Sequence, residues 1–223
     1  MEIIEKYTSE GFVEVSVISE EYIKFFSEFF GDREQAIKLL RTCYEMDNVI
    51  PRRIINNISR LISLGDEMIS IKPGRHVLAV FYWIVCIEAT SHIANHGAKV
   101  RDKIKIIRRF FAECIDEADQ AFLLEHIERS LSDERAQNSS GLNLDIIATI
   151  FYNIRHDFVH EGNYSNFHFS QKNDERIINS LTMKEHGKDK EEERSYYVLI
   201  TYEQMRKIII KGLLNFLKKK MQT

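Results

Sequence analysis

Proline and glycine are scarce in this chain of 223 residues, which holds only two prolines and nine glycines. So few turn-forming residues argue against a turn-rich β-sandwich. Apolar residues instead recur every three to four positions over long stretches, which is the period of an amphipathic helix. We therefore expect an all-α fold, with a core drawn from the 44% of residues that are hydrophobic.

Cysteines and long apolar runs are also few. Cys43, Cys86 and Cys114 are widely spaced in apolar surroundings and form no CxxC motif, a pattern typical of reduced core thiols. The longest apolar run, residues 77–87, is much shorter than the roughly twenty residues that span a bilayer. The N-terminus lacks the basic and apolar regions of a signal peptide. The sequence thus predicts a cytoplasmic protein with no membrane contact.

Neither sign of charge dominates, because 31 Lys and Arg residues face 34 Asp and Glu residues, for a net charge of −3. Contact with nucleic acid would therefore depend on a local basic patch. The best candidate is the outer face of a helix expected over residues 100–114, which carries Arg101, Lys105 and Arg108. These residues are candidates for contacting RNA phosphates, although an ordinary solvated helix face has the same composition.

Helix start and stop signals divide the chain in two. Helices expected over residues 20–30, from 32 onward and over 51–65 form an N-terminal helical layer, and Pro73-Gly74 marks a boundary after residue 72. Residues 1–72 suggest no chemistry, and residues 73–223 form a helical domain. Its expected helices cover residues 75–96, 100–114, 116–131, a segment ending near 160, and 201–220. The first of these is apolar nearly all round, as a helix at the centre of a bundle is.

Two segments have strand character instead. Residues 164–169 alternate in polarity and residues 196–200 are rich in β-formers, so we expect a small β-hairpin before the last helix, with a solvated charged loop at 184–194. Residues 11–17 alternate as well and predict one more short strand.

The stretch from Phe151 to Gly162 is the most informative in the chain. Its apolar residues predict a helix whose inner stripe includes Ile154 and Phe158, and Gly162 ends that helix. At about 100° per residue from Ile154, five side chains of this stretch point away from the core. They are Tyr152, Arg155, His156, Val159 and His160. A face with these side chains and no Lys or Glu is typical of a covered surface, so we expect the functional site here.

The order Arg155-His156-Asp157-Phe158-Val159-His160 resembles the R-[N/D/H]-x-x-x-H signature of the HEPN superfamily. The likeness extends to a central apolar helix containing Glu88 and to a closing helix over residues 201–220. The short strand-forming region before that last helix resembles the Apea-like branch of the superfamily. It covers roughly residues 73–223. The resemblance implies a helical bundle that acts as an endoribonuclease, in a homodimer whose two motifs share one cleft.

These residue types suit RNA cleavage without a metal or other cofactor. An imidazole such as that of His160 can take the proton of a 2′-hydroxyl or protonate the leaving 5′-oxygen, which yields a 2′,3′-cyclic phosphate. Arg155 offers a fork of donors to phosphate oxygens, and His156 would orient Arg155 or contact the backbone. Further candidates for contacting the substrate are Tyr152, Asn153 and Glu88. Such an enzyme fits a toxin or phage-defence effector, with an antitoxin or regulatory protein as a possible partner.

Other interpretations stay open. His92, His96, His156 and His160 form two pairs with a spacing of four, which is compatible with zinc binding. A catalytically silent HEPN-type module that binds RNA or nucleotide, or that only dimerises, would carry the same sequence. A cationic residue in the last turn of a helix also complements the helix dipole without further purpose.

Overall fold

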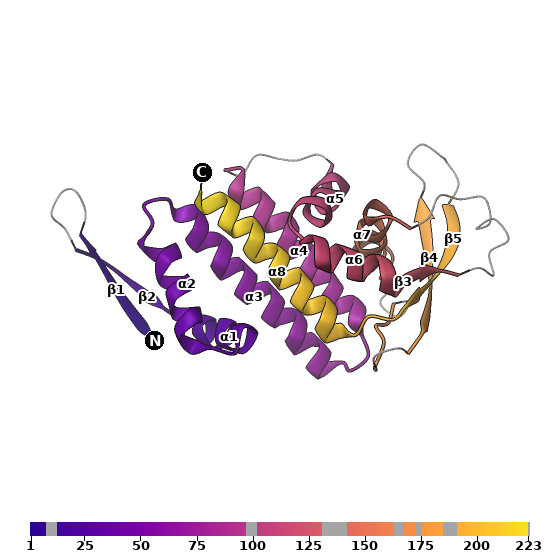
Figure 1. Ribbon diagram of the computed structural model, residues 1–223, viewed down its shortest axis with the longest axis horizontal. Helices are drawn as coiled ribbons and strands as arrows, with labels where there is room; N and C mark the ends of the chain where they lie inside the picture. Colours follow the sequence, from indigo (N-terminus) through magenta and orange to yellow (C-terminus); the bar gives the residue numbers. More distant parts are fainter. Residues whose placement is uncertain are drawn as a thin grey trace.

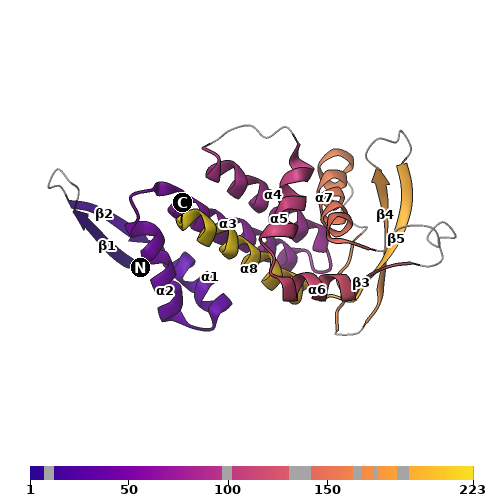
Figure 2. The same cartoon turned by 45° about the horizontal axis from the view of Figure 1, so that its top comes forward.

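The computed structural model describes residues 1–7, 13–96, 102–130, 142–162, 167–172, 175–184 and 191–222. Over these ranges the chain is mostly helical, with eight helices and two small antiparallel sheets (Figure 1). The expected helical majority is confirmed, whereas all-α is too narrow a description, because strands form at both ends of the molecule. Figures 1 and 2 show the two sheets at opposite ends of an elongated helical body.

The first sheet is a hairpin of β1 (Glu2–Tyr7) and β2 (Val13–Ile18), in which Ile3 pairs with Val17. The sequence predicted a short strand over residues 11–17 and missed its partner, β1. Of the predicted strand, residues 11 and 12 lie outside the described part of the chain.

Three helices follow the hairpin. They are α1 (Glu20–Phe30), α2 (Arg33–Glu45) and α3 (Val49–Ile71). The first two begin as expected, because Ser19 and Asp32 accept hydrogen bonds from amides of the first turns. The first also ends as expected, since Gly31 closes α1 in the left-handed conformation. The prediction that the third helix spans residues 51–65 was wrong at both ends.

Gly65 lies inside α3 because it serves packing rather than termination. A Cβ atom at this position would lie 3.3 Å from the Cα atom of Ala79 on the next helix, α4 (His76–Ala94). The glycine therefore lets the backbones of α3 and α4 approach closely. The predicted boundary at 72/73 falls in the turn between these two helices, and one buried cluster includes residues from both sides of it.

The bundle surrounds α4 (His76–Ala94), whose Trp83 is only 1% exposed. Its neighbours are α3, α5, α7 and α8 (Figures 1 and 2). Among the described residues, α4 is also the one helix long and apolar enough to cross a membrane, yet half of that stretch is buried inside the fold. This arrangement agrees with the predicted central helix. The bounds of the other helices are Lys103–Glu113 for α5, Glu117–His126 for α6, Leu144–Glu161 for α7 and Tyr202–Met221 for α8.

The second sheet has the order β3-β5-β4, with β3 (Ile127–Arg129), β4 (Ile177–Lys184) and β5 (Glu191–Val198). The helix expected over residues 116–131 ends at His126, because Ile127 pairs with Val198 and both are buried in the sheet. A hairpin does precede the last helix, but its first strand is not at 164–169. Residues 167–169 form no strand, residues 163–166 lie outside the described ranges, and β4 takes that place.

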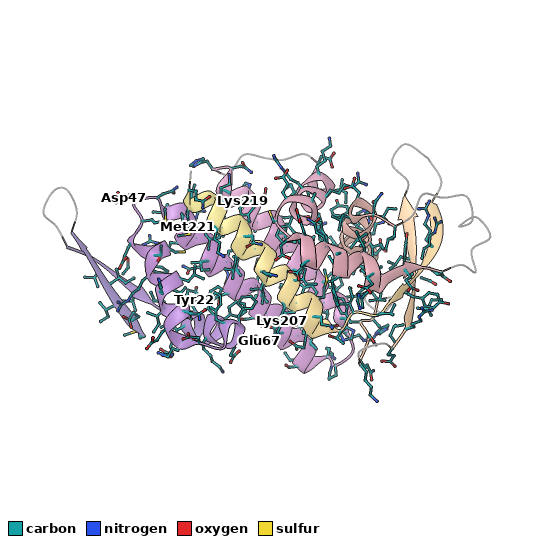
Figure 3. All side chains as sticks on the ribbon, in the orientation of Figure 1. Tyr22, Asp47, Glu67, Lys207, Lys219 and Met221 are labelled. Carbon is teal, nitrogen blue, oxygen red and sulfur yellow. The ribbon has the colours of Figure 1, made fainter. Side chains whose placement is uncertain are left out.

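The last helix, α8, starts with the predicted capping box. The Thr201 side chain accepts a hydrogen bond from the Gln204 amide, and the Gln204 side chain accepts one from the Thr201 amide. The helix runs along α3 and α4 and ends near Lys219 and Met221 (Figure 3).

Candidate active site

Helix α7 carries the motif and is fixed at both ends. Asn143 accepts a hydrogen bond from the Ile146 amide at its start, and Gly162 adopts a φ of 64° at its end, where its amide donates to the Asp157 carbonyl. In between, Ile147, Ile150, Phe151 and Ile154 are at most 2% exposed. The predicted helix, its inner stripe and its glycine stop are all confirmed, so the motif occupies the last two turns.

Arg155 does not face away from the core, contrary to the prediction. Its side chain is 12% exposed, and its Nη2 atom lies 3.4 Å from Oε2 of Glu88 on α4. The position is at the edge of the apolar stripe, and a long side chain there reaches the neighbouring helix. A guanidinium removed from water in this way requires a carboxylate partner.

The Glu88 carboxylate holds a second cation, since Nζ of Lys103 lies 3.6 Å from the same oxygen. Lys103 was missed at the sequence level because nothing in the pattern marks one lysine at the start of α5 as a partner of α4. Arg155 Nε and Glu88 Oε1 are buried and have no hydrogen-bond partner among the described residues. The pair thus retains one unused donor and one unused acceptor.

His156 and His160 do face outward, as predicted. Their ring centroids lie 4.5 Å apart, and the ring of Tyr152 lies 6.5 Å from that of His156, so three rings follow one stripe of α7. The His156 side chain is 43% exposed, with Nδ1 3.5 Å from Asp157 Oδ1, and His160 and Val159 are exposed beside it. Burial raises the pKa of Tyr152, so its phenol stays protonated at neutral pH.

The predicted basic track for RNA is only partly available. Arg108 is not directed to solvent alone, because its Nε and Nη2 donate to Thr149 Oγ1 on α7 at 3.3 and 3.1 Å. Lys105 is exposed, and its Nζ atom lies 3.1 Å from Oδ2 of Asp102. Arg101 lies outside the described residues, and Asn153 is half-buried on α7. Arg108 therefore ties α5 to α7 beside the motif, while Lys105 alone of the three is seen to be exposed.

The four-histidine metal site is not assembled within one chain. His92 and His96 are exposed at the end of α4, and no three His, Cys, Asp or Glu side chains of the described ranges come close enough to hold a metal ion. The spacing of four places each pair on one helix face but does not bring the two pairs together.

No protein-family model, curated protein or solved structure matches this chain. The resemblance to the HEPN superfamily therefore depends on the residues of this sequence and stays a prediction.

Proposed function

We propose that this protein is a metal-independent endoribonuclease of HEPN type that works as a homodimer. One observation supports this proposal more strongly than any other. A mostly buried Arg155–Glu88 pair, with an unused guanidinium N–H, lies on the same two helical turns as two solvent-exposed imidazoles in mutual contact. The charged pair and the two imidazoles thus lie at the same end of α7, and the order of residues resembles a ribonuclease signature.

The chemistry needs a base, an acid and positive charge. His160 removes the proton from a ribose 2′-hydroxyl or protonates the leaving 5′-oxygen, since imidazole gains and loses a proton near neutral pH. The 2′-oxygen attacks the adjacent phosphorus, the bond to the 5′-oxygen breaks, and a 2′,3′-cyclic phosphate and a 5′-hydroxyl result. Arg155 stabilises the charge that develops on the phosphoryl oxygens, and His156 contacts the backbone.

A second copy of the chain would complete this site. Arg155 is mostly covered and shares Glu88 with Lys103, so a single chain offers little free positive charge for a phosphorane. Two α7 ends that face one another would double the imidazoles and guanidinium groups in one cleft. Val159, which is 47% exposed beside His160, supplies apolar surface for such a contact.

The alternative is a silent module that binds RNA or nucleotide, or that only dimerises. The observation that favours it is the same ion pair, because a guanidinium that is 12% exposed and bound to Glu88 also has a purely structural explanation. Activity measurements separate the two functions.

The decisive experiment is cleavage of total RNA and of an end-labelled oligonucleotide in EDTA, with analysis of the product ends. Variants H160A and H156A should lose activity, and H92A, which removes an exposed histidine at the end of α4, should retain it. Because R155A leaves Glu88 without that partner, it is tested beside R155A/E88Q, in which both charges are absent, with folding checked by circular dichroism.

Cleavage that survives EDTA, yields 2′,3′-cyclic phosphate ends and disappears in H160A and in R155A/E88Q supports the enzyme. Intact RNA with a folded wild-type dimer contradicts it, and RNA binding without cleavage then favours the silent module. Sedimentation in solution gives the oligomeric state directly.

A further inference from the structure

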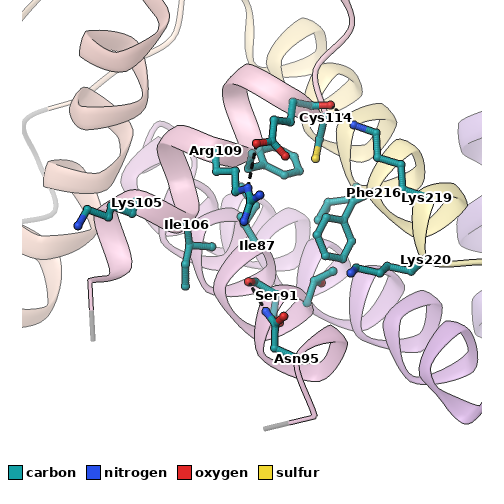
Figure 4. A pocket seen from close by; sticks show the side chains of 14 residues that line it. Ile87, Ser91, Asn95, Lys105, Ile106, Arg109, Cys114, Phe216, Lys219 and Lys220 are labelled. Atoms are coloured by element: carbon teal, nitrogen blue, oxygen red, sulfur yellow. Dashed lines mark hydrogen bonds and ion pairs between the residues drawn. The ribbon is translucent and has the colours of Figure 1, made fainter. Parts of the chain in front are cut away.

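A cavity of about 360 Å³ lies between α4, α5 and α8, on the side of α5 that faces away from α7 (Figure 4). This volume is within the range of small-molecule binding sites, roughly 300 to 1,000 Å³. On α5 it is bordered by Ile106, Arg109 and Phe110, whereas Arg108 of the same helix bonds to Thr149 on α7. The cavity is therefore separate from the proposed ribonuclease site.

The walls of the cavity are mostly apolar. They include Ile87 of α4, Ile106 and Phe110 of α5, and Leu213 and Phe216 of α8. The polar side chains of Thr90, Ser91 and Asn95 also line it, but Asn95 donates to the Ser91 carbonyl and Thr90 accepts from Asn57. A ligand that replaces water here is stabilised by the burial of its own apolar surface. The body of the ligand is thus a hydrocarbon chain or a single ring rather than a sugar.

Cationic side chains lie at the opening of the cavity, which we call its mouth. Figure 4 shows Arg109 and Lys220 pointing into the cavity from different helices, while Lys105 points away from it. Lys219 donates to the backbone carbonyl of Glu113, and Lys220 lies 5.9 Å from the centre of the Phe216 ring. The mouth therefore favours a negatively charged head group.

The charge of that head group is limited by Glu113. Its Oε1 accepts a hydrogen bond of 2.9 Å from Arg109 Nε, which leaves the terminal nitrogens of the guanidinium for a ligand. The Glu113 carboxylate also borders the cavity and opposes a second negative charge. A singly charged carboxylate fits this balance better than a phosphate dianion.

Gly212 lets Phe110, which borders the cavity, pack closely on α8. A Cβ atom at this position on α8 would lie 2.7 Å from Cζ of Phe110 and 3.4 Å from Cγ1 of Ile115. Because glycine leaves this space empty, the Phe110 ring lies against α8 and borders the cavity without filling it. A larger residue would displace the ring.

We propose that this cavity binds a small amphipathic carboxylate, with its apolar body between α4, α5 and α8 and its carboxylate at Arg109 and Lys220. The site is independent of the endoribonuclease proposal and needs no RNA.

The test uses octanoate as the charged probe, octan-1-ol as its uncharged match and inorganic phosphate as an anion without an apolar body, each titrated by calorimetry into the full chain. Octanoate should bind, octanol more weakly and phosphate not measurably. In R109Q/K220Q the affinity for octanoate should fall roughly tenfold or more, while octanol is unaffected. K218Q, at an exposed position of α8 outside the cavity lining, is the matched control and should bind octanoate like the wild type.

G212A should weaken both octanoate and octanol, because the displaced Phe110 ring occupies their space. R109Q/K220Q keeps the test valid if G212A fails to fold, since its substitutions are at the mouth. Binding of none of the probes, equal binding of octanoate and octanol, octanoate affinity unchanged in R109Q/K220Q, or phosphate binding as tightly as octanoate would each overturn the proposal.

Discussion

Oε2 of Glu88 lies 3.4 Å from Nη2 of Arg155 and 3.6 Å from Nζ of Lys103, so one carboxylate on α4 holds cations from α7 and α5. The Glu88 and Arg155 side chains are 13% and 12% exposed. Removing one member of a largely buried pair leaves the other charge uncompensated, which costs more than the pair itself contributes.

We therefore expect E88Q to lower the free energy of unfolding by about 1 to 3 kcal/mol, measured by urea denaturation. The double variant E88Q/R155M should cost less than the sum of the two single variants, because it leaves no buried charge unpaired beside α4. Lys103 also loses Glu88 in this variant, but its side chain is 48% exposed. E113Q, at an exposed position on α5, is the matched control. Additive losses would contradict the coupling of Glu88 and Arg155.

Gly65 gives a prediction about the contact between α3 and α4. In G65L the new side chain would be directed at the α4 backbone, where even a Cβ atom lies 3.3 Å from the Ala79 Cα and 3.5 Å from the Tyr82 Cβ. The helices must separate, and we expect a loss of roughly 1 to 3 kcal/mol or more in the free energy of unfolding. E67L, at an exposed position on the same helix, should change stability little, and equal stability of the two variants would argue against the close approach.

Local sequence signals predicted the helices well because they act over a few residues. Ser19, Asp32 and Thr201 accept hydrogen bonds from first-turn amides, and Gly31 and Gly162 end helices in the left-handed conformation. Each of these features belongs to one segment and its nearest neighbours, so the sequence shows it directly.

Several of the misses involve partners that are distant in the chain. Gly65 looked like a helix stop because its contact is with Ala79, and Ile127 looked helical because its partner is Val198. Arg155 was placed outward because periodicity gives the direction of a Cα–Cβ bond, whereas a long side chain bends toward a carboxylate on another helix. Helical period alone cannot supply these tertiary contacts.

Asp66 connects α3 to α8 and gives a third prediction. Its carboxylate accepts hydrogen bonds from Nε and Nη2 of Arg206, at 2.9 and 2.7 Å, and from the Tyr202 hydroxyl at 2.5 Å. We expect D66N to lower the free energy of unfolding by about 2 kcal/mol, because Arg206 loses its charged acceptor. Y202F removes one donor and should cost about 1 kcal/mol.

The control for Asp66 is its neighbour Glu67, which is exposed. E67Q should leave the denaturation midpoint close to that of the wild type. If E67Q and D66N had equal effects, a general loss of negative charge on α3, rather than the specific bonds of Asp66, would explain the result.

His76 predicts a dependence of stability on pH. Its Nδ1 accepts a hydrogen bond of 3.1 Å from the Phe169 amide, and its ring stacks on Tyr202 with centroids 5.9 Å apart. Burial, helped by His168, lowers the pKa of His76 from 6.5 to about 4. Since the unfolded chain binds this proton more readily, the contribution of His76 is complete above about pH 6.5 and is lost as the pH falls toward 4.

Because the ring is only partly shielded from water, we expect His76 to account for about 1 to 2 kcal/mol of the stability lost between pH 7 and pH 4.5. Urea denaturation at several pH values measures this loss in the wild type and in H76N, whose amide oxygen can still accept the Phe169 amide but does not titrate. The difference between the two curves isolates His76 from the carboxylates, which titrate in both proteins. H92A removes an exposed histidine and should follow the wild-type curve. A wild-type curve parallel to that of H76N would mean that His76 takes up its proton equally well in the folded protein.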